Sequence, residues 1–281
     1  MPELIFANLL TSSNYNDEEK RTTGGKNGFG AKLANIFSKR FELEIIHPQS
    51  QQKYKQVFTE NMTKIEPPVI SKCNDKKGLV KITYWPDLKR FGHTQFTDDF
   101  IKLISRRVYD IAACTPKKVV CYLNDEKIPV KNWEDYVNLY IGTKQETFRI
   151  SESPNERWDV VIAPSHNDFQ QISFVNSICT SKGGSHVDSV VNPLVKKVID
   201  ELSKKIPGIK SAFIKNHMFV AVRAVLENPS FDSQIKETCT SRWPTFGSRC
   251  DLSDKFYKAF MKSPIIEEAR ALAKHKESRD L

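Results

Sequence analysis

The stretch Thr23-Gly24-Gly25-Lys26-Asn27-Gly28-Phe29-Gly30-Ala31-Lys32-Leu33 carries the most informative local pattern of this chain. Its glycines allow a tight turn that can point main-chain N–H groups at one centre. A helix that begins after the turn would add its positive end, and apolar residues with helical spacing follow at Leu33, Ile36, Phe37 and Phe41. This pattern fits a phosphate-binding loop and a plain helix-entry loop equally well.

Two familiar nucleotide motifs do not match this stretch. Gly25 and Gly30 have the separation of a Walker A loop, but Ala31-Lys32 follows where Lys-Ser or Lys-Thr is required. The dinucleotide pattern GxGxxG is not present either. The polar run Thr11-Ser12-Ser13-Asn14 could hydrogen-bond a ribose or a phosphate, and a turn at the end of a helix is the simpler alternative.

Composition narrows the class of protein. The chain has 281 residues, 39% of them hydrophobic and 17 of them Phe, so disorder is excluded over most of its length. Lys and Arg exceed Asp and Glu by 43 to 34, a net charge of +9, which favours an anionic partner or simply aids solubility. No apolar run approaches a membrane span, and six cysteines without a Cys-x-x-Cys pair indicate reduced thiols inside the cell and no metal site.

Strands and helices alternate along the first half, which predicts an α/β class. Strand patterns cover 41–45 and 79–85, a helical pattern covers 100–111, and a hairpin with Asn124-Asp125 at its turn covers 119–130. Two stretches are predicted to be connections, at 66–78 and 143–156.

The second half continues in the same style, with strands predicted over 158–162, 171–178 and 218–225. A long apolar stripe begins at Val187, and Pro193 lies inside it. Either a helix kinks at Pro193, or a helix begins there with Asn192 as its cap. Residues 253–276 are predicted to be helical with a break at Pro264.

Three further segments could carry chemistry. The run Lys182-Gly183-Gly184-Ser185-His186 is either a second anion loop or a tight connection, and a general-base role for His186 has no Ser/Cys–His–Asp set to support it. The polar loop 228–236 ends on Lys236, which could meet a phosphate as a point charge. Lys204-Lys205, with Lys196-Lys197 before it, fits either a DNA-backbone contact or a solvated helix face.

These motifs together resemble a known family. The segments 9–15, 23–33 and 35–38 resemble the ATP-binding region of the eukaryotic type IIA DNA topoisomerases (topoisomerase II). The segments that resemble the transducer of the same family are 170–178, 182–184, 186–188, 215–217 and 227–234. The resemblance covers nearly the whole chain.

The resemblance implies an α/β fold of the two-layer α+β kind, in two domains. Residues 1–130 would be the C-terminal part of an incomplete GHKL (Bergerat-type) ATPase domain. Residues 131–281 would be a transducer domain of ribosomal-protein-like α/β fold, ending in the helix that leads to the Toprim domain.

In this family, ATP binding closes a gate between two protomers, and one double-stranded DNA segment passes through another. ATP, Mg²⁺, DNA, a homodimer and a nuclear location are therefore expected, and a membrane is not.

The resemblance also assigns residues. The implied ATP contacts are Ser12, Ser13, Asn14, Gly25, Lys26, Asn27, Gly28, Phe29, Gly30, Ala31, Lys32, Gln234, Ile235 and Lys236. The implied DNA contacts are Lys204 and Lys205. The chain departs from the family pattern at three places: Ile235 stands where the family has Thr, Ser185 where it has Arg, and Ser203 where it has Lys.

The family's catalytic Glu and its Mg²⁺-binding Asn lie in a segment that precedes Pro2 in the resemblance. No catalytic residue and no metal ligand is therefore expected in this chain, and residues 1–281 alone are expected to lack ATPase and DNA cleavage. An alternative is a truncated, non-catalytic paralogue that binds DNA or dimerises. A GHKL protein of another branch, such as a mismatch-repair or chaperone ATPase, is disfavoured by the Gln-x-Lys loop at 234–236.

Overall fold

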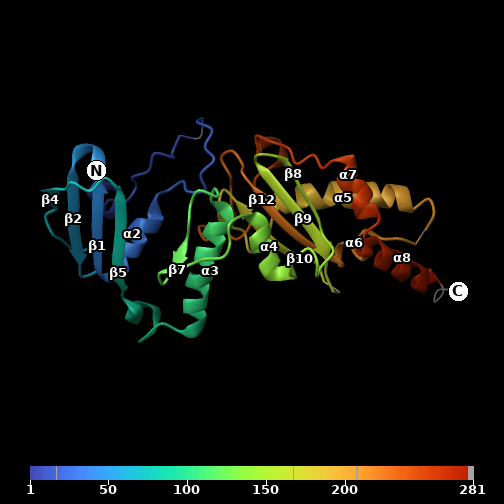
Figure 1. The fold of residues 1–281 in the computed structure, drawn as a ribbon, viewed down its shortest axis with the longest axis horizontal. Coiled ribbons are helices and arrows are strands. Elements are labelled where there is room, and N and C mark those ends of the chain that lie inside the picture. Colours follow the sequence, from blue (N-terminus) through green and yellow to red (C-terminus); the bar gives the residue numbers. More distant parts are fainter. Residues whose placement is uncertain (17, 167, 207, 278–281) are drawn as a thin grey trace. The chain divides into compact units, whose positions relative to one another are not determined.

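The computed structural model describes residues 1–16, 18–166, 168–206 and 208–277, and its chain forms two compact units (Figure 1). The first unit consists of residues 1–18 and 25–101, and the second of residues 19–24 and 102–281. Both units combine helices with a five-stranded sheet, which confirms the α/β class. Every helix in the described residues is too short or too polar to span a lipid bilayer.

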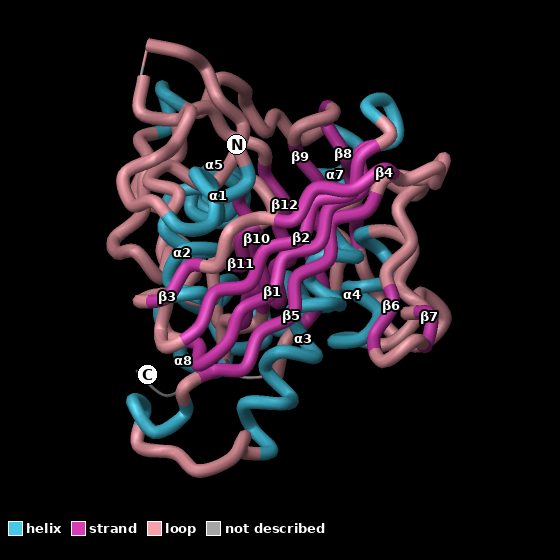
Figure 2. The backbone as a smooth tube through the Cα atoms, turned by 90° about the vertical axis from the view of Figure 1, so that its left-hand side faces the viewer, coloured by secondary structure: helices cyan, strands magenta, loops and turns pink. Residues whose placement is uncertain are grey.

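The first unit is built on an antiparallel sheet of strand order β3-β2-β1-β5, with β4 also paired to β2. Figure 2 shows β4, β2, β1 and β5 running side by side. The elements of this unit are α1 (Pro2–Ala7), α2 (Phe29–Ile36), β1 (Ser38–His47), β2 (Gln52–Thr59), β3 (Lys64–Ile65), β4 (Val69–Lys72) and β5 (Leu79–Pro86). Helix α3 (Asp98–Cys114) begins in this unit and continues into the second.

One face of this sheet is apolar because side chains alternate along each strand. Phe41 and Leu43 of β1 are buried on that face together with Phe58 of β2. Helices α1 and α2 supply the cover, and the ring of Phe6 lies 6.0 Å from that of Phe41. The other face is charged, and Glu44 pairs there with the ammonium of Lys53 at 2.6 Å.

The second unit contains a mixed sheet of order β11-β10-β12-β9-β8. Strands β10 and β12 are parallel, and α5 lies in the crossover between them, as a parallel pair requires. The elements are β6 (Tyr122–Leu123), β7 (Glu126–Lys127), α4 (Trp133–Ile141), β8 (Ile150–Asn155), β9 (Trp158–Pro164), β10 (Gln170–Val175), β11 (Ile178–Cys179), α5 (Ser185–Leu202), α6 (Ser211–Lys215), β12 (Met218–Ala224), α7 (Asp254–Met261) and α8 (Pro264–Glu277).

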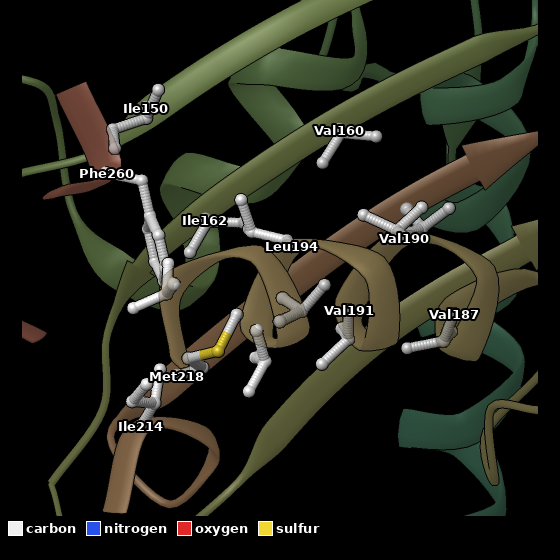
Figure 3. Packing of buried hydrophobic residues seen from close by; sticks show 14 of the residues in the cluster. Ile150, Val160, Ile162, Val187, Val190, Val191, Leu194, Ile214, Met218 and Phe260 are labelled. Atoms are coloured by element: carbon white, nitrogen blue, oxygen red, sulfur yellow. The ribbon is translucent and has the colours of Figure 1, made fainter. Parts of the chain in front are cut away.

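This second sheet is buried on both faces. Val160 and Ile162 of β9 belong to the cluster that contains the apolar stripe of α5, and Figure 3 shows them beside Val190 and Leu194 of that helix. Val161, between them on the strand, faces the cluster that contains α4. The strands are therefore continuous apolar runs, which is typical of strands covered on both sides.

The structure corrects several predicted boundaries. Helix α2 ends at Ile36, so Phe37 and Phe41 do not continue its apolar face, and Phe41 belongs to β1. The strand predicted over 171–178 is two strands, because Asn176 and Ser177 adopt positive φ values of 48° and 66° and form a hairpin turn. The predicted connections at 66–78 and 143–156 contain strands β4 and β8.

Helix α5 runs without interruption from Ser185 to Leu202. The alternative start at Pro193 is wrong, and the proline lies within the helix. Val190 and Val191 before it and Leu194 after it are all buried on the sheet, and this packing outweighs the hydrogen bond that a proline removes. The break at Pro264 and the turn at Asn124-Asp125 are confirmed.

Candidate functional site

The two polar segments of the first unit that the sequence singled out lie together. The Ser12 hydroxyl donates to the Lys26 carbonyl at 2.6 Å and accepts from the Asn14 N–H at 3.1 Å. The Asn14 side-chain amide donates to the Gly25 carbonyl at 2.8 Å. The run 11–14 therefore forms one wall of the glycine-rich loop, although ten residues separate Asn14 from Gly25.

Gly28 is the residue at which this loop turns into α2. Its φ of +66° lies in the left-handed region, and a Cβ there would stand 2.7 Å from the Thr11 carbonyl oxygen. Any side chain would therefore push the two walls of the loop apart. As the N-cap of α2, Gly28 also offers no side-chain oxygen to the first-turn N–H groups, which keep their capacity to bind an anion.

Lys32 supports the loop from inside. Its side chain is buried, and its ammonium donates to the Gly28 carbonyl at 2.9 Å and to the Thr11 carbonyl at 3.1 Å. These charge-assisted bonds fasten the turn to the polar segment and place a positive charge at the helix entry. Positive charge, uncapped amides and a tight turn together favour a phosphate.

The remaining loop residues leave space for a ligand. A Cβ added at Gly25 or Gly30 would meet no atom within 4 Å, so these glycines face open space, unlike Gly28. Ser13 is exposed, whereas Lys26, Asn27, Phe29 and Ala31 are half-buried. The structure thus brings every predicted ATP contact of the range 12–32 into one local loop.

The other predicted ATP contacts lie in a loop of the second unit. Asp232 closes this loop, because its N–H donates to the Thr238 carbonyl at 3.1 Å and its carboxylate accepts from the Thr238 N–H at 3.2 Å. Inside it, the Lys236 N–H donates to the Ser233 carbonyl at 3.1 Å. Ile235 in this loop is 74% exposed.

Lys236 lies in a positive environment. Burial lowers the pKa of its ammonium, and the charge of Arg21 lowers this pKa further. Arg21 belongs to the segment 19–24, which is part of the second unit. A bound anion would reduce the electrostatic repulsion between the two cations, so this local charge favours a phosphate ligand.

The segment 19–24 is fixed to the second unit by contacts that sequence reasoning missed. The Asn228 N–H donates to the Arg21 carbonyl at 2.9 Å, and the Arg21 N–H donates to the Asn228 side-chain oxygen at 3.1 Å. Lys20 pairs with Glu227 at 3.2 Å, and hydrogen bonds from Arg157 and Lys20 lower the pKa of that carboxyl. Since Arg21 and Asn228 are 207 positions apart in the sequence, no local pattern could have indicated this pair.

His186 does not have the environment of a general base. Its side chain is fully buried, and its Nε2 lies 3.1 Å from the Thr180 hydroxyl. Burial lowers the pKa of the imidazole to about 3. The ring therefore stays neutral and serves as a packing and hydrogen-bonding group.

The predicted DNA contacts lie at the end of α5. Lys204 and Lys205 are exposed in the turn that follows the helix, where the Lys205 N–H donates to the Leu202 carbonyl at 2.9 Å. Lys197, by contrast, pairs with Asp254 at 3.3 Å and lies 4.1 Å from the ring centre of Tyr257. Within the described residues, no group of three or more His, Cys, Asp or Glu could hold a metal ion.

Comparison with known proteins adds independent findings. The family model described as DNA gyrase B matches residues 120–279. The DNA topoisomerase 2 of Arabidopsis thaliana is 47% identical over 289 aligned residues, and the probable DNA topoisomerase 2 of Dictyostelium discoideum is 47% identical over 288. The alignments cover 100% of this chain but only 20% and 19% of those relatives, so the chain spans about a fifth of their length.

Two solved structures are similar to this chain over nearly its whole length. The ATPase region of Saccharomyces cerevisiae topoisomerase II superposes with a TM-score of 0.90 at 42% identity, over 97% of this chain and 71% of that one. The ATPase and transducer domains of DNA topoisomerase II from Balamuthia mandrillaris superpose with a TM-score of 0.92 at 39% identity, over 99% and 72%. The resemblance drawn from the motifs is confirmed.

Proposed function

Because the chain belongs to the DNA gyrase B family and matches the ATPase region of the DNA topoisomerase 2 proteins, we propose that it binds ATP and relays the bound state to DNA strand passage. The proposed domains are residues 1–130 for the GHKL part and residues 131–281 for the transducer. Strand passage and control of DNA topology belong to the whole enzyme, of which this segment would be the nucleotide-responsive part.

The closed loop around Gly28 is the observation that carries the proposal. Its main chain cannot accept a side chain at Gly28, and it presents the uncapped start of α2 beside the buried ammonium of Lys32. Phosphate oxygens are the ligands that such N–H groups and charges prefer. Ser12 and Asn14 fix the loop through hydrogen bonds to its carbonyls.

The loop of the second unit would complete the recognition of ATP. Lys236 supplies a positive charge that an oxygen of the terminal phosphate would neutralise, and Gln234 and Ile235 would lie alongside. ATP carries the terminal phosphate and ADP does not, so this loop would distinguish the two nucleotides. Ile235 cannot contribute the hydroxyl that the family's Thr has.

Hydrolysis of bound ATP needs more than the phosphate contacts described above. Water attack on the terminal phosphate requires a positioned base and a metal ion that neutralises charge. No step is assigned to the metal, because the resemblance places its Asn ligand outside this chain. We expect residues 1–281 to bind ATP without turning it over, and steady release of phosphate by the purified chain would contradict this expectation.

The decisive test measures binding of a fluorescent ATP analogue to the whole chain. Gly28→Ala should weaken binding by roughly 10- to 100-fold, the loss expected when one or more charge-assisted hydrogen bonds are misplaced. Gly78→Ala is the matched control, because a Cβ there meets only ordinary contacts at 3.7 Å and φ is not in the left-handed region. Unchanged affinity in a folded Gly28→Ala variant would refute the site.

The proposed partners are double-stranded DNA and a second copy of the chain in the full enzyme, in the nucleus. Lys204 and Lys205 would contact the DNA backbone. Replacing both by Ala should reduce the slope of log binding constant against log salt by about 1.8, since each phosphate contact contributes about 0.9. An unchanged slope would remove these lysines from the interface.

A further inference from the structure

The segment 182–185 leads from β11 into the first residue of α5 and has no part in the function proposed above. It consists of Lys182, Gly183, Gly184 and Ser185, and its two glycines suggested either an anion loop or a tight connection. Three of its four amides have acceptors within the protein: Lys182 N–H donates to the Glu237 carbonyl at 3.0 Å, Gly183 N–H to the Thr180 carbonyl at 2.9 Å, and Ser185 N–H to the Cys239 carbonyl at 3.0 Å. These bonds favour the tight connection over the anion loop.

The segment 182–185 instead binds the residues that directly follow Lys236. The Cys239 N–H donates to the Gly183 carbonyl at 3.0 Å, and the Ser185 N–H donates to the Cys239 carbonyl at 3.0 Å. Together with the bond from Lys182 to Glu237, three main-chain hydrogen bonds join the segment to residues 237–239. Glu237 directly follows Lys236, so this pairing begins one residue after the proposed phosphate contact.

Gly184 permits this approach. A Cβ at this position would lie 2.2 Å from the Cys239 carbonyl oxygen and 2.6 Å from its nitrogen, and φ is +127°. Main-chain atoms cannot move aside as a flexible side chain can, so any other residue would separate the two segments. Gly184 is therefore required because Cys239, which follows the Lys236 loop, passes so close to it.

Side chains reinforce the pairing at its exposed edge. The Lys182 ammonium lies 2.7 Å from the Glu237 carboxylate, and the Ser181 hydroxyl donates to the same carboxylate at 3.3 Å. An exposed ion pair of this kind contributes little by itself. Because the ion pair joins side chains only, it can be altered by mutation without disturbing the main chain, and it therefore offers a test of the pairing.

The pairing also connects the loop to a rigid element. Ser185 is the first residue of α5, and Val187 and Val190 in the next turns are buried in the core of the sheet. The bonds between Asp232 and Thr238 only close the loop on itself. The contacts to 182–185 are what fix the closed loop to the start of a packed helix.

We propose that residues 182–185 form a clasp and that Gly184 is a positioning residue, which holds Lys236 where it can meet the terminal phosphate of ATP. This inference rests on the proposed function, in which Lys236 recognises that phosphate. The clasp contacts no ligand, and it acts by restricting the orientations of the loop 232–238. Restricting them in advance lowers the entropic cost of binding.

The test compares the affinities of fluorescent ATP and ADP analogues for the whole chain. Their ratio isolates recognition of the terminal phosphate, which a general loss of structure would not selectively change. Lys236→Ala should lower the preference for ATP by about tenfold, the loss expected for one charge-assisted contact. Gly184→Ala should lower it to a similar extent and leave the ADP affinity unchanged. The double variant should be no worse than the worse single variant.

Gly183→Ala is the matched control. Its φ of +72° imposes the same kind of backbone strain, but a Cβ there meets only the side chain of Gln171, at 3.4 Å. This variant should keep the preference for ATP. If Gly184→Ala does not fold, Lys182→Glu should lower the preference by about twofold, and Lys182→Glu combined with Glu237→Lys should restore it.

The outcomes separate the two ideas. If Lys236→Ala lowers the preference for ATP while folded Gly184→Ala and Lys182→Glu variants keep it, the clasp is refuted and the proposed function stands. If Lys236→Ala leaves the preference unchanged, the role of Lys236 in the proposed function is wrong, and the clasp falls with it. A loss in Gly184→Ala that adds fully to the loss in Lys236→Ala also refutes the clasp.

Discussion

The sheets of the two units differ in how completely they are covered. In the second unit, β9 and β12 are buried on both faces, and Val160, Val161 and Val222 are almost inaccessible to solvent. In the first unit, α1 and α2 cover β1 and β2, but β5 is left open. Ile82 and Tyr84 of β5 pair with Leu43 and Phe41 of β1, so they share the apolar face, yet they are 44% and 48% exposed.

This difference shows where the stability of the chain resides. Full burial of a large aliphatic side chain contributes about 1.5–3 kcal/mol, so a sheet packed on both faces gains that amount at nearly every strand position. A sheet packed over part of one face gains much less. The second unit should therefore unfold last, and it provides the firm support for the clasp and the Lys236 loop.

Two tryptophans test this comparison with the largest expected effect. Trp158 in β9 is fully buried, and its indole N–H donates to the Ser248 hydroxyl at 2.8 Å. Trp158→Ala should lower the free energy of unfolding by about 3–5 kcal/mol, because a large cavity and an unpaired hydroxyl remain. Denaturant titration followed by circular dichroism measures the change.

Trp85 in β5 is the control. It is 47% exposed, and its ring lies 5.9 Å from the Arg40 guanidinium. Trp85→Ala should cost about 1 kcal/mol or less, since the side chain fills no closed core. Equal losses for the two variants would show that the two sheets are equally well packed and would break the comparison.

The sequence predicted those parts of the fold that depend on local patterns. The apolar spacing over 100–111 predicted a helix, which the structure has at Asp98–Cys114 with Asp98 and Asp99 in its first turn. Asn124-Asp125 gives the predicted hairpin turn. Strand β8 was missed because its sequence Ile-Ser-Glu-Ser-Pro-Asn is polar and contains a proline, and it forms at the edge of the sheet, where such residues are tolerated.

The functional geometry depended on contacts between distant residues. The resemblance assigned Ser12, Gly28 and Lys236 as ATP contacts from continuous strings of sequence, and these roles stay predictions. It gave no indication that Lys32 would be buried beneath the loop, or that Gly184 would meet the main chain of Cys239. Such facts depend on which backbone atoms approach each other, and one-dimensional spacing does not contain them.

A pH titration sharpens the comparison, because His186 is fully buried in the second unit. Its pKa is lowered by burial to about 3, whereas unfolded histidine titrates near 6.5. Between these two pH values, His186 therefore binds a proton in the unfolded state but not in the folded state. As pH falls from about 6.5 towards 3, stability should decrease by up to about 1.4 kcal/mol per pH unit from this residue.

The useful window lies between pH 5 and 6.5. The carboxyl of Glu227, whose pKa is lowered by hydrogen bonds from Arg157 and Lys20, reduces stability only at lower pH, once its unfolded form takes up a proton below about 4.3. His186→Gln can still hydrogen-bond the Thr180 hydroxyl but does not titrate. The variant should have a flatter stability profile in this window, and an identical slope would show that the imidazole is accessible to protons when folded.

The smallest effect is expected on the open face of the first sheet. Ile82→Thr keeps a β-branched side chain in β5 and removes apolar surface that is already 44% exposed. We expect the free energy of unfolding to change by about 0.5 kcal/mol or less and the chain to associate less at high concentration, as measured by light scattering. The register partner Leu43 is 1% exposed, so Leu43→Ala should cost about 2–5 kcal/mol. A large loss in Ile82→Thr would mean that β5 is covered in solution, and the contrast between the two sheets would then not hold.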